Sequence, residues 1–367
     1  MASQKALYLV EKQGSFAIRE RDIPTPAAGD LLVKIKAVAL NPLDWKVQAT
    51  GMFVDTYPAI LGLDIAGDVE QVGEGVEGFG IGDRVVFQGR YENDYAGFQL
   101  FTKASAEFTA KACRFVFDGI VIPEATTYSQ AASVPSGLVT AAIGLFAEAP
   151  AGAALITSLD DSIKFTNQGA LVIGGSSSVG QYGKLGLSML DELTQSSRLP
   201  AIQLLKWSGF SPIVAYASGH HTDHLKGIGA THVIDRKTVH LQDLPDTVKK
   251  VTDARVEIGF DAIGIPDTQE AGYASVADGG SFCTVLPIPF KGVVESKAVY
   301  YISSLGTDRM FLRSLFSKIE GMLESGTVMP NNVEELPGGL EGVLEGLERL
   351  KKDQVSGKKL IALVQEK

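Results

Sequence analysis

Cysteine is scarce in this 367-residue sequence, which holds only Cys113 and Cys283. Two cysteines cannot build the disulfide framework of a secreted scaffold, so we interpret them as small buried side chains in a reducing compartment. The histidines cluster between His220 and His240 and make no zinc-type spacing with the cysteines. The sequence therefore predicts neither a disulfide scaffold nor a Cys/His metal site.

Long apolar runs and excess positive charge are also lacking. No stretch of about 18 apolar residues predicts a membrane-spanning helix, and no apolar run follows residues 1–5 as it would in a signal peptide. The formal net charge of −10 argues against nucleic acid or an anionic membrane as a partner. We therefore expect a soluble, cytoplasmic protein, and its length suits two domains.

The first 110 residues or so are rich in short β-type segments. Residues 32–37 alternate apolar and polar side chains, as a half-buried strand does. Glycines then recur at short intervals, at positions 62, 67, 73, 75, 78, 80 and 82. Short strands joined by glycine turns predict a compact β-rich domain.

The middle of the chain has a different rhythm, with short apolar runs separated by helical patterns. The runs are Ala170–Ile173, Pro212–Tyr216, His232–Ile234, Val256–Phe260 and Ser281–Val285. This alternation predicts an α/β fold with a doubly wound parallel sheet. The tail should form helices over 311–324 and 340–352 and a closing strand over 360–364.

A glycine- and serine-rich loop follows the first apolar run and precedes a predicted helix. Its residues are Gly174, Gly175, Ser176, Ser177, Ser178, Val179 and Gly180. Glycines let the backbone approach a pyrophosphate, and a helix N-terminus supplies N–H groups and a positive dipole. A flexible glycine/serine turn is the alternative, because the pattern is not a strict G-x-G-x-x-G, but its setting favours a dinucleotide-binding loop.

The second apolar run of this domain ends near Ser218, without the acid that usually holds the ribose 2′-hydroxyl of NAD. A missing carboxylate removes repulsion against the 2′-phosphate of NADPH. Ser218, Arg236 and the pair His220 and His221 could bind that phosphate, or they could be solvated loop residues. We therefore predict NADPH as the cofactor.

Several motifs occur in a characteristic order along the chain. They are residues 41–46 (Asn-Pro-Leu-Asp-Trp-Lys), 62–67 (Gly-Leu-Asp-Ile-Ala-Gly), 72–76, 82–85, the glycine/serine loop, 336–342 and 355–360. This order resembles the medium-chain dehydrogenase/reductase superfamily, and most closely its zinc-independent fungal trans-acting enoyl reductases and GroES-like, quinone-oxidoreductase-like proteins. The resemblance covers nearly the whole chain.

The resemblance implies an architecture and a set of site residues. Residues 1–139, completed by 306–367, would form a GroES-like catalytic domain, and 140–305 a Rossmann NADP-binding domain. Asn41 and Asp44 would lie beside the nicotinamide ribose or substrate, Lys46 would donate to substrate or cofactor, Thr140 would lie near the nicotinamide, and Lys358 would reach the cofactor. The alternatives are a turn role for Asn41 and a surface position for either lysine.

The sequence departs from the zinc alcohol dehydrogenases that it otherwise resembles. Where those enzymes carry a cysteine and a Gly-His-Glu motif, this chain has Asn41-Pro-Leu-Asp44 and Gly62-Leu-Asp64, and the four-cysteine lobe is missing. Asp44 and Asp64 alone cannot supply a three-ligand zinc site with nitrogen and sulfur donors. We therefore predict no metal, which disfavours simple alcohol oxidation.

No proton donor stands out. The loop where mitochondrial enoyl reductases carry a tyrosine has Phe53, which has no hydroxyl, and Tyr57 precedes a proline. The hypothesis is that water supplies the proton, with Tyr57 as the alternative.

Two segments exceed the family pattern, Gly183–Pro200 and Ala112–Val121. They are either surface insertions, which loops tolerate, or retained intron sequence.

The leading function is NADPH-dependent reduction of an activated C=C bond, as by an enoyl or enone reductase. The alternatives are an NADPH quinone oxidoreductase and an NADPH-binding protein without turnover, acting as a sensor or partner subunit. The family also implies a small-molecule substrate and a polyketide synthase as partner, with the chain a monomer or homodimer.

Overall fold

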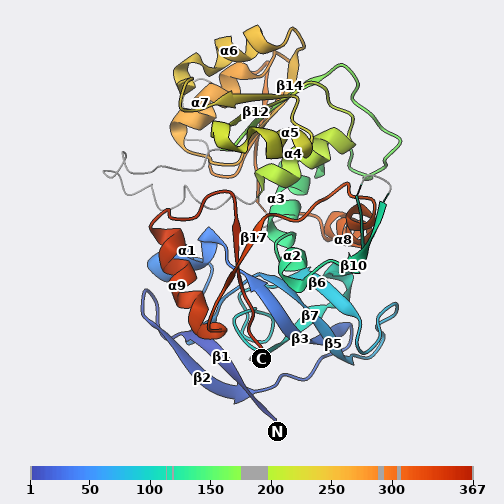
Figure 1. The fold of residues 1–367 in the computed structure, drawn as a ribbon, viewed down its shortest axis with the longest axis vertical. Helices are drawn as coiled ribbons and strands as arrows, with labels where there is room; N and C mark the ends of the chain where they lie inside the picture. The colour runs from blue at the N-terminus through green and yellow to red at the C-terminus, as the bar shows by residue number, and fades with distance from the viewer. Residues whose placement is uncertain are drawn as a thin grey trace. The chain divides into compact units, whose positions relative to one another are not determined.

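The computed structural model describes residues 2–112, 114–117, 120–174, 197–287, 293–303 and 307–365. The chain divides into two compact units, residues 1–136 with 316–367, and residues 137–315. The chain passes from one unit to the other at two places, each inside a helix (Figure 1). These helices are α3 (Pro135–Phe146) and α8 (Arg309–Glu324). The resemblance to known reductases implies domain boundaries after residues 139 and 305.

The first unit is built on an open, mainly antiparallel sheet whose central strand is β3. In sheet order its strands are β17 (Val333–Leu336), β18 (Lys359–Ala362), β3 (Asp30–Ala39), β5 (Asp64–Val72), β6 (Arg84–Gln88) and β8 (Thr109–Lys111), while β7 (Phe101–Ser105) pairs with β3 beside this path. The half-buried Lys34 and Lys36 alternate in β3 with fully buried apolar neighbours, which confirms the predicted strand.

Smaller elements complete this unit. They are β1 (Ser3–Leu9), β2 (Phe16–Asp22), β4 (Ala59–Ile60), β9 (Arg114–Phe117), β10 (Ile120–Ala125), the 3-10 helix η1 (Ala106–Phe108), and the helices α1 (Pro42–Thr50), α2 (Tyr128–Ala132) and α9 (Leu340–Lys351). Strands β9 and β10 pair antiparallel, and β10 extends beyond the segment Ala112–Val121 that exceeds the family pattern.

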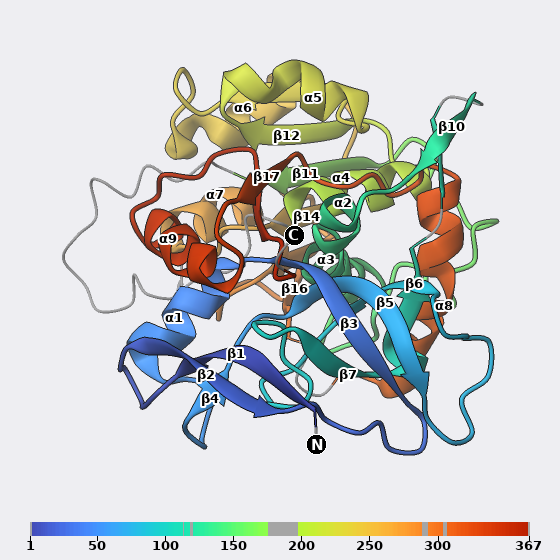
Figure 2. The ribbon, with the colours of Figure 1, turned by 60° about the horizontal axis from the view of Figure 1, so that its bottom comes forward.

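The C-terminal tail is part of the first unit. Strand β18 pairs antiparallel with β3, with Ile361 opposite Ala39. Helix α9 lies against α1, as Figures 1 and 2 both show. Gly346 lets α9 pack closely on the sheet side of this core, because a Cβ at that position would overlap the side chains of Leu40 after β3 and Leu336 in β17. The tail therefore contributes to the hydrophobic core of the first unit, which also contains residues of α1.

The second unit contains a parallel sheet with the order β13-β12-β11-β14-β15-β16. These strands are β11 (Gly169–Ile173), β12 (Ile213–Ala217), β13 (His232–Asp235), β14 (Val256–Asp261), β15 (Ser281–Thr284) and β16 (Ala298–Tyr301). In order of appearance this is 3-2-1-4-5-6, the arrangement of dinucleotide-binding folds. The predicted doubly wound sheet is confirmed.

Helices flank this sheet, so that β11 and β12 are buried along their whole length. The helical elements are α4 (Arg198–Trp207), α5 (Thr222–Gly227), α6 (Leu244–Val251), α7 (Pro266–Ser275), and the 3-10 helices η4 (Gly219–His221) and η5 (Leu241–Asp243). None of the helices in the described ranges is long and apolar enough to cross a membrane.

Candidate functional site

The start of helix α1 holds two of the predicted site residues. Asn41 precedes the helix in an extended conformation, and Pro42 takes its first position, where a proline costs no hydrogen bond. The Asn41 backbone N–H donates to Asp44 Oδ2 at 2.8 Å, the reciprocal half of a capping box. Asn41 is 3% exposed and Asp44 is fully buried. The local sequence thus fixes both side chains inside the first unit.

A buried lysine joins this helix start to two strands. Lys359, at the beginning of β18, donates from Nζ to Asn41 Oδ1 at 2.5 Å and to Asp64 Oδ2 at 3.0 Å. The Asn41 Nδ2 group donates to the same Asp64 oxygen at 3.0 Å. The side chains of Lys359 and Asp64 are 7% and 0% exposed. We call Asn41, Asp64 and Lys359 the lysine triad.

Asp64 has further donors on its other oxygen. Oδ1 accepts from the Ser136 backbone N–H at 2.7 Å and from Ser136 Oγ at 2.5 Å, and Gln88 donates to that hydroxyl. Sequence reasoning missed both Lys359 and Ser136. The available signal for Lys359 was a charged residue at the start of an otherwise apolar strand, while Ser136 gave none.

Asp44 lies beside the lysine triad with a different environment. Burial raises the pKa of Asp44 to about 7; the Asn41 N–H acts against this, the Asp64 charge adds to it, and the Lys359 charge opposes it. Burial also raises the pKa of Tyr91 well above its ordinary value, with the Asp44 and Asp64 charges adding to the effect. The helix start therefore holds a carboxyl that is able to carry a proton at neutral pH.

The two predicted lysines have different surroundings. Lys46 is fully buried, with Nζ 5.6 Å from the ring centroid of Trp45, so it is not a surface lysine. Lys358 is about half exposed and pairs with Glu334 at 3.3 Å. Thr140 lies half-buried on α3, in the unit formed by residues 137–315.

The carboxyl edge of the parallel sheet brings Ser218 and Arg236 together. Ser218 follows β12, Arg236 follows β13, and Arg236 Nε donates to Ser218 Oγ at 2.9 Å. The sequence missed a third group here: Asp235 ends β13, and a Cβ at Gly219 would overlap its carboxylate. Hydrogen bonds from the backbone N–H groups of Lys237 and Gly219 contribute to lowering the pKa of Asp235. We call Ser218, Asp235 and Arg236 the strand-edge cluster.

Other predicted cofactor residues are only partly described. His220 and His221 follow Ser218, and their ring centroids are 3.9 Å apart. Gly174 directly follows β11, and its N–H donates to the Tyr216 carbonyl oxygen. The rest of the loop, Gly175, Ser176, Ser177, Ser178, Val179 and Gly180, lies outside the described residues, as does most of the Gly183–Pro200 segment.

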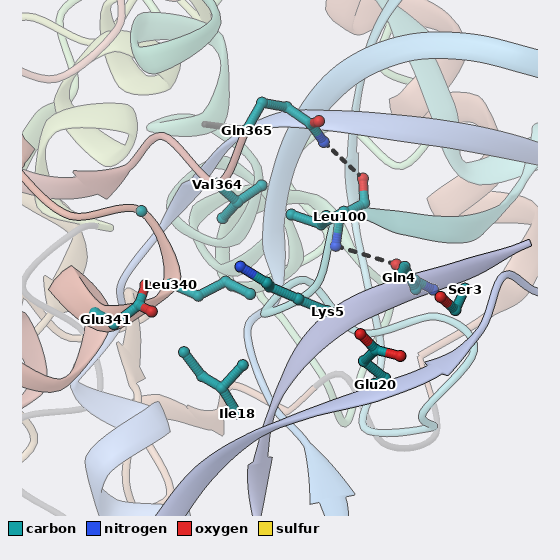
Figure 3. A pocket seen from close by; sticks show the side chains of 11 residues that line it. Ser3, Gln4, Lys5, Ile18, Glu20, Leu100, Leu340, Glu341, Val364 and Gln365 are labelled. Carbon is teal, nitrogen blue, oxygen red and sulfur yellow. Dashed lines mark hydrogen bonds between the residues drawn. The ribbon is translucent and has the colours of Figure 1, made fainter. Parts of the chain in front are cut away.

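A separate cavity of about 290 Å³ lies in the first unit, between β1, β2 and the start of α9 (Figure 3). Lys5, Glu20 and Glu341 bring charge to its lining, and Ile18 and Leu340 bring apolar surface. Gln365 borders it and donates to the Leu100 carbonyl oxygen at 3.0 Å. The sequence-predicted site residues are not among those that line this cavity.

The donors at the lysine triad do not fit a catalytic zinc ion. Zinc takes nitrogen and sulfur ligands with few carboxylates, whereas Asp64 already accepts hydrogen bonds on both oxygens and Lys359 adds a positive charge. Within the described residues, no three side chains among His, Cys, Asp and Glu come together as metal ligands.

Comparison with known proteins assigns the family. Residues 27–142 match the alcohol dehydrogenase GroES-like domain, and residues 199–293 match the zinc-binding dehydrogenase domain. The chain is 30% identical to the dehydrogenase orsE of Emericella nidulans, over 98% of this chain and 99% of that protein. The chain belongs to the medium-chain dehydrogenase/reductase superfamily. This superfamily consists of NAD(P)-binding oxidoreductases.

Further relatives of this superfamily protein carry more specific names. It is 30% identical to the trans-enoyl reductase resD of Aspergillus sclerotiorum, with 94% of this chain and 95% of that protein covered. Its fold is also that of an alcohol dehydrogenase superfamily protein from Novosphingobium aromaticivorans, with a TM-score of 0.75, 20% identity, and 99% and 100% of the two chains covered. The second domain match begins at residue 199, after the glycine/serine loop.

Proposed function

We propose that this protein is a zinc-free reductase that uses NADPH to reduce an activated carbon–carbon double bond, as in an enone or an enoyl thioester. The observation that carries the proposal is the lysine triad. In place of metal ligands, the first unit has a buried ammonium group whose partners are Asp64 and Asn41. Relatives named trans-enoyl reductases match most of the chain at about 30% identity and support the substrate class.

The cofactor would be held by the second unit. Its bound nicotinamide ring would supply a hydride. The loop Gly174–Gly180 would hold the pyrophosphate, because it follows the central strand of a parallel sheet with the dinucleotide-binding order. Ser218 and Arg236 would bind the 2′-phosphate, since the hydrogen bond between them already orients the guanidinium group. Lys358 would add a positive charge from the tail.

The polar groups of the first unit would stabilise charge on the substrate. Hydride addition to the β-carbon moves the π electron pair onto the carbonyl oxygen, and the α-carbon then takes a proton. A preorganised donor at that oxygen stabilises the enolate. Asn41 suits this role, because its amide is held by Lys359 and Asp64, and Lys46 would be a second donor. Thr140 would lie near the nicotinamide, and Asp44 beside the reacting groups.

The test is oxidation of NADPH by the purified protein, followed by its absorbance, with a panel of enones, enoyl thioesters, quinones and aldehydes. We expect turnover with an enone or enoyl thioester that survives treatment with a zinc chelator. Preferred turnover with quinones would instead assign a quinone oxidoreductase. Cofactor binding without oxidation by any acceptor would contradict an enzymatic role.

Two variants connect the activity to the site. Asn41→Ala should lower kcat by about 100-fold, the usual effect of removing one oxyanion donor. Lys352→Met removes a surface lysine that pairs with Glu348 and is about half exposed, so it should leave kcat unchanged. Equal activity in both variants would exclude Asn41 from the reaction.

A further inference from the structure

Two fully buried carboxyl groups lie close to one ammonium group in the first unit, and their hydrogen-bond partners are unequal. Asp64 accepts from Lys359, from the Asn41 amide and twice from Ser136. Asp44 accepts from the Asn41 backbone N–H through Oδ2. Its other polar neighbours are the Gly62 backbone N–H and the Tyr91 hydroxyl, and among the described residues neither makes a close hydrogen bond to Oδ1. One carboxyl is thus solvated by the protein and the other only in part.

A single ammonium group can neutralise only one of these carboxylates. Ionised groups removed from water need both an opposite charge and donors for their lone pairs. Asp64 has both, so it is the ionised partner of Lys359. A second negative charge on Asp44 would have fewer close donors than Asp64 has and would be repelled by Asp64, so the proton stays on Asp44. Two neighbouring carboxyl groups in such unequal surroundings have different pKa values, so that one is protonated while the other is ionised.

The same lysine fixes the orientation of the Asn41 amide. An ammonium group can only donate and an ionised carboxylate can only accept. Asn41 must therefore turn Oδ1 toward Lys359 and Nδ2 toward Asp64, as the two distances show. The opposite orientation would place like atoms against each other at both ends. The donor that Asn41 presents to a ligand is thus fixed by Lys359.

We infer that Lys359 is a positioning residue for the reductase site: it keeps Asp64 ionised, orients the Asn41 amide, and leaves Asp44 as the carboxyl that holds a proton. This role rests on the proposed function. The charged or titratable groups that face Asp44 are Asp64 from β5, Lys359 from β18 and Tyr91 from the loop after β6. Lys46 lies two residues further along the same helix and is also buried.

The arrangement is tested by infrared titration of the protein without cofactor or substrate. The difference spectrum between wild type and Asp44→Asn should show a protonated-carboxyl band that titrates near neutral pH. The band of Asp261 in the second unit, whose pKa burial raises to about 6, is common to both proteins and cancels. In Asp64→Asn, Lys359 loses its carboxylate partner and pairs with Asp44, so the titration should move down by about one to three pH units. A difference spectrum without a carboxyl band, or an unmoved Asp44 titration in Asp64→Asn, would overturn the assignment.

Variants of Lys359 separate positioning from folding. Lys359→Arg keeps the charge and should retain the wild-type titration and pH–rate profile. Lys359→Met should move the Asp44 titration to higher pH, opposite to Asp64→Asn. If Lys359→Met fails to fold, the double variant Lys359→Met/Asp64→Asn, which leaves no unpaired charge, should fold and keep Asp44 protonated.

The pH dependence of kcat completes the test. It should move with the infrared titration in Asp64→Asn and in the double variant, and stay in place in Lys352→Met. A rate profile that does not follow the infrared shift would overturn the positioning role. The infrared measurement needs no turnover, so it decides the charge states of Asp44 and Asp64 by itself. A protein that binds NADPH but reduces no acceptor would contradict only the proposed function.

Discussion

The lysine triad and the strand-edge cluster are both polar, but they differ in burial. The Lys359–Asp64 pair, at 3.0 Å, has side chains 7% and 0% exposed, with donors on both oxygens of the carboxylate. In the strand-edge cluster, Ser218 is buried, whereas Asp235 and Arg236 are half-buried beside exposed loop residues. The first cluster is almost entirely buried and is held by its own hydrogen bonds, while the charged groups of the second are partly exposed to solvent. The two clusters should therefore respond differently to the loss of a charge.

The largest expected effect comes from breaking the lysine triad. Lys359→Met should destabilise the protein by about 3–5 kcal/mol, because it leaves a buried carboxylate without its counter-ion. Urea unfolding monitored by circular dichroism measures this change. The matched control is Lys352→Met, since Lys352 and Glu348 are also 3.0 Å apart but about half exposed. That variant should unfold at the same urea concentration as the wild type, and equal losses in both variants would show that burial is not the cause.

Asp44 gives the next effect, which depends on pH. Because burial raises its pKa to about 7 in the folded protein, the folded state holds a proton between about pH 4 and 7 that the unfolded state has lost. Wild-type stability should therefore fall as the pH rises through this range, by roughly 4 kcal/mol for a shift of about three units. Asp44→Asn keeps the acceptor for the helix cap and lacks this proton.

The measurement is the difference in unfolding free energy between Asp44→Asn and the wild type. It should grow in favour of the variant from about pH 4 to pH 7 and then level off. A constant difference over this range would show that Asp44 titrates as an exposed carboxyl does.

The two clusters also differ in how well the sequence predicts them. Ser218 and Arg236 each follow a strand of a parallel sheet, and such strands end at a common edge, so local order along the chain was enough to predict that they meet. Lys359 lies 295 residues from Asp64 and 318 from Asn41. Nothing local brings them together; that contact depends on β18 joining β3. The tail motif pointed to the exposed Lys358, which precedes β18, whereas Lys359 is the first residue of that fully buried strand.

The Asp235 carboxylate is a second contact that the order of residues along the chain does not predict, here between neighbouring strands. The sequence suggested an edge without an acid because Ser218 follows β12, yet the next strand brings Asp235 against Gly219. Register between neighbouring parallel strands, with Ala217 opposite Asp235, determines this contact. The sequence of a single strand therefore cannot predict the contact between Asp235 and Gly219.

The strand-edge cluster can be tested through cofactor choice. Arg236→Met should raise the KM for NADPH by about 10- to 100-fold, since hydrogen bonds to charged groups contribute about 1.5–3 kcal/mol, and leave the KM for NADH nearly unchanged. Asp235→Asn should act in the opposite direction and lower the KM for NADPH, because it removes a negative charge beside the phosphate site. Steady-state kinetics with both cofactors measure the two ratios. Arg255→Met, at an exposed arginine of the same unit, is the control, and a parallel change for NADH and NADPH in Arg236→Met would contradict 2′-phosphate recognition.

The smallest expected effect concerns Tyr57, a buried polar group that belongs to neither cluster. Its hydroxyl has no hydrogen-bond partner among the described residues, and its ring packs against the core of the first unit. Burial raises the pKa of Tyr57, with the Asp55 charge adding to it, so the group holds its proton at neutral pH. If water protonates the substrate, Tyr57→Phe should change kcat by less than about threefold, whereas loss of a general acid costs about 10²- to 10⁴-fold. The thermal midpoint separates the remaining case: a large loss of kcat at an unchanged midpoint would make Tyr57 the proton donor.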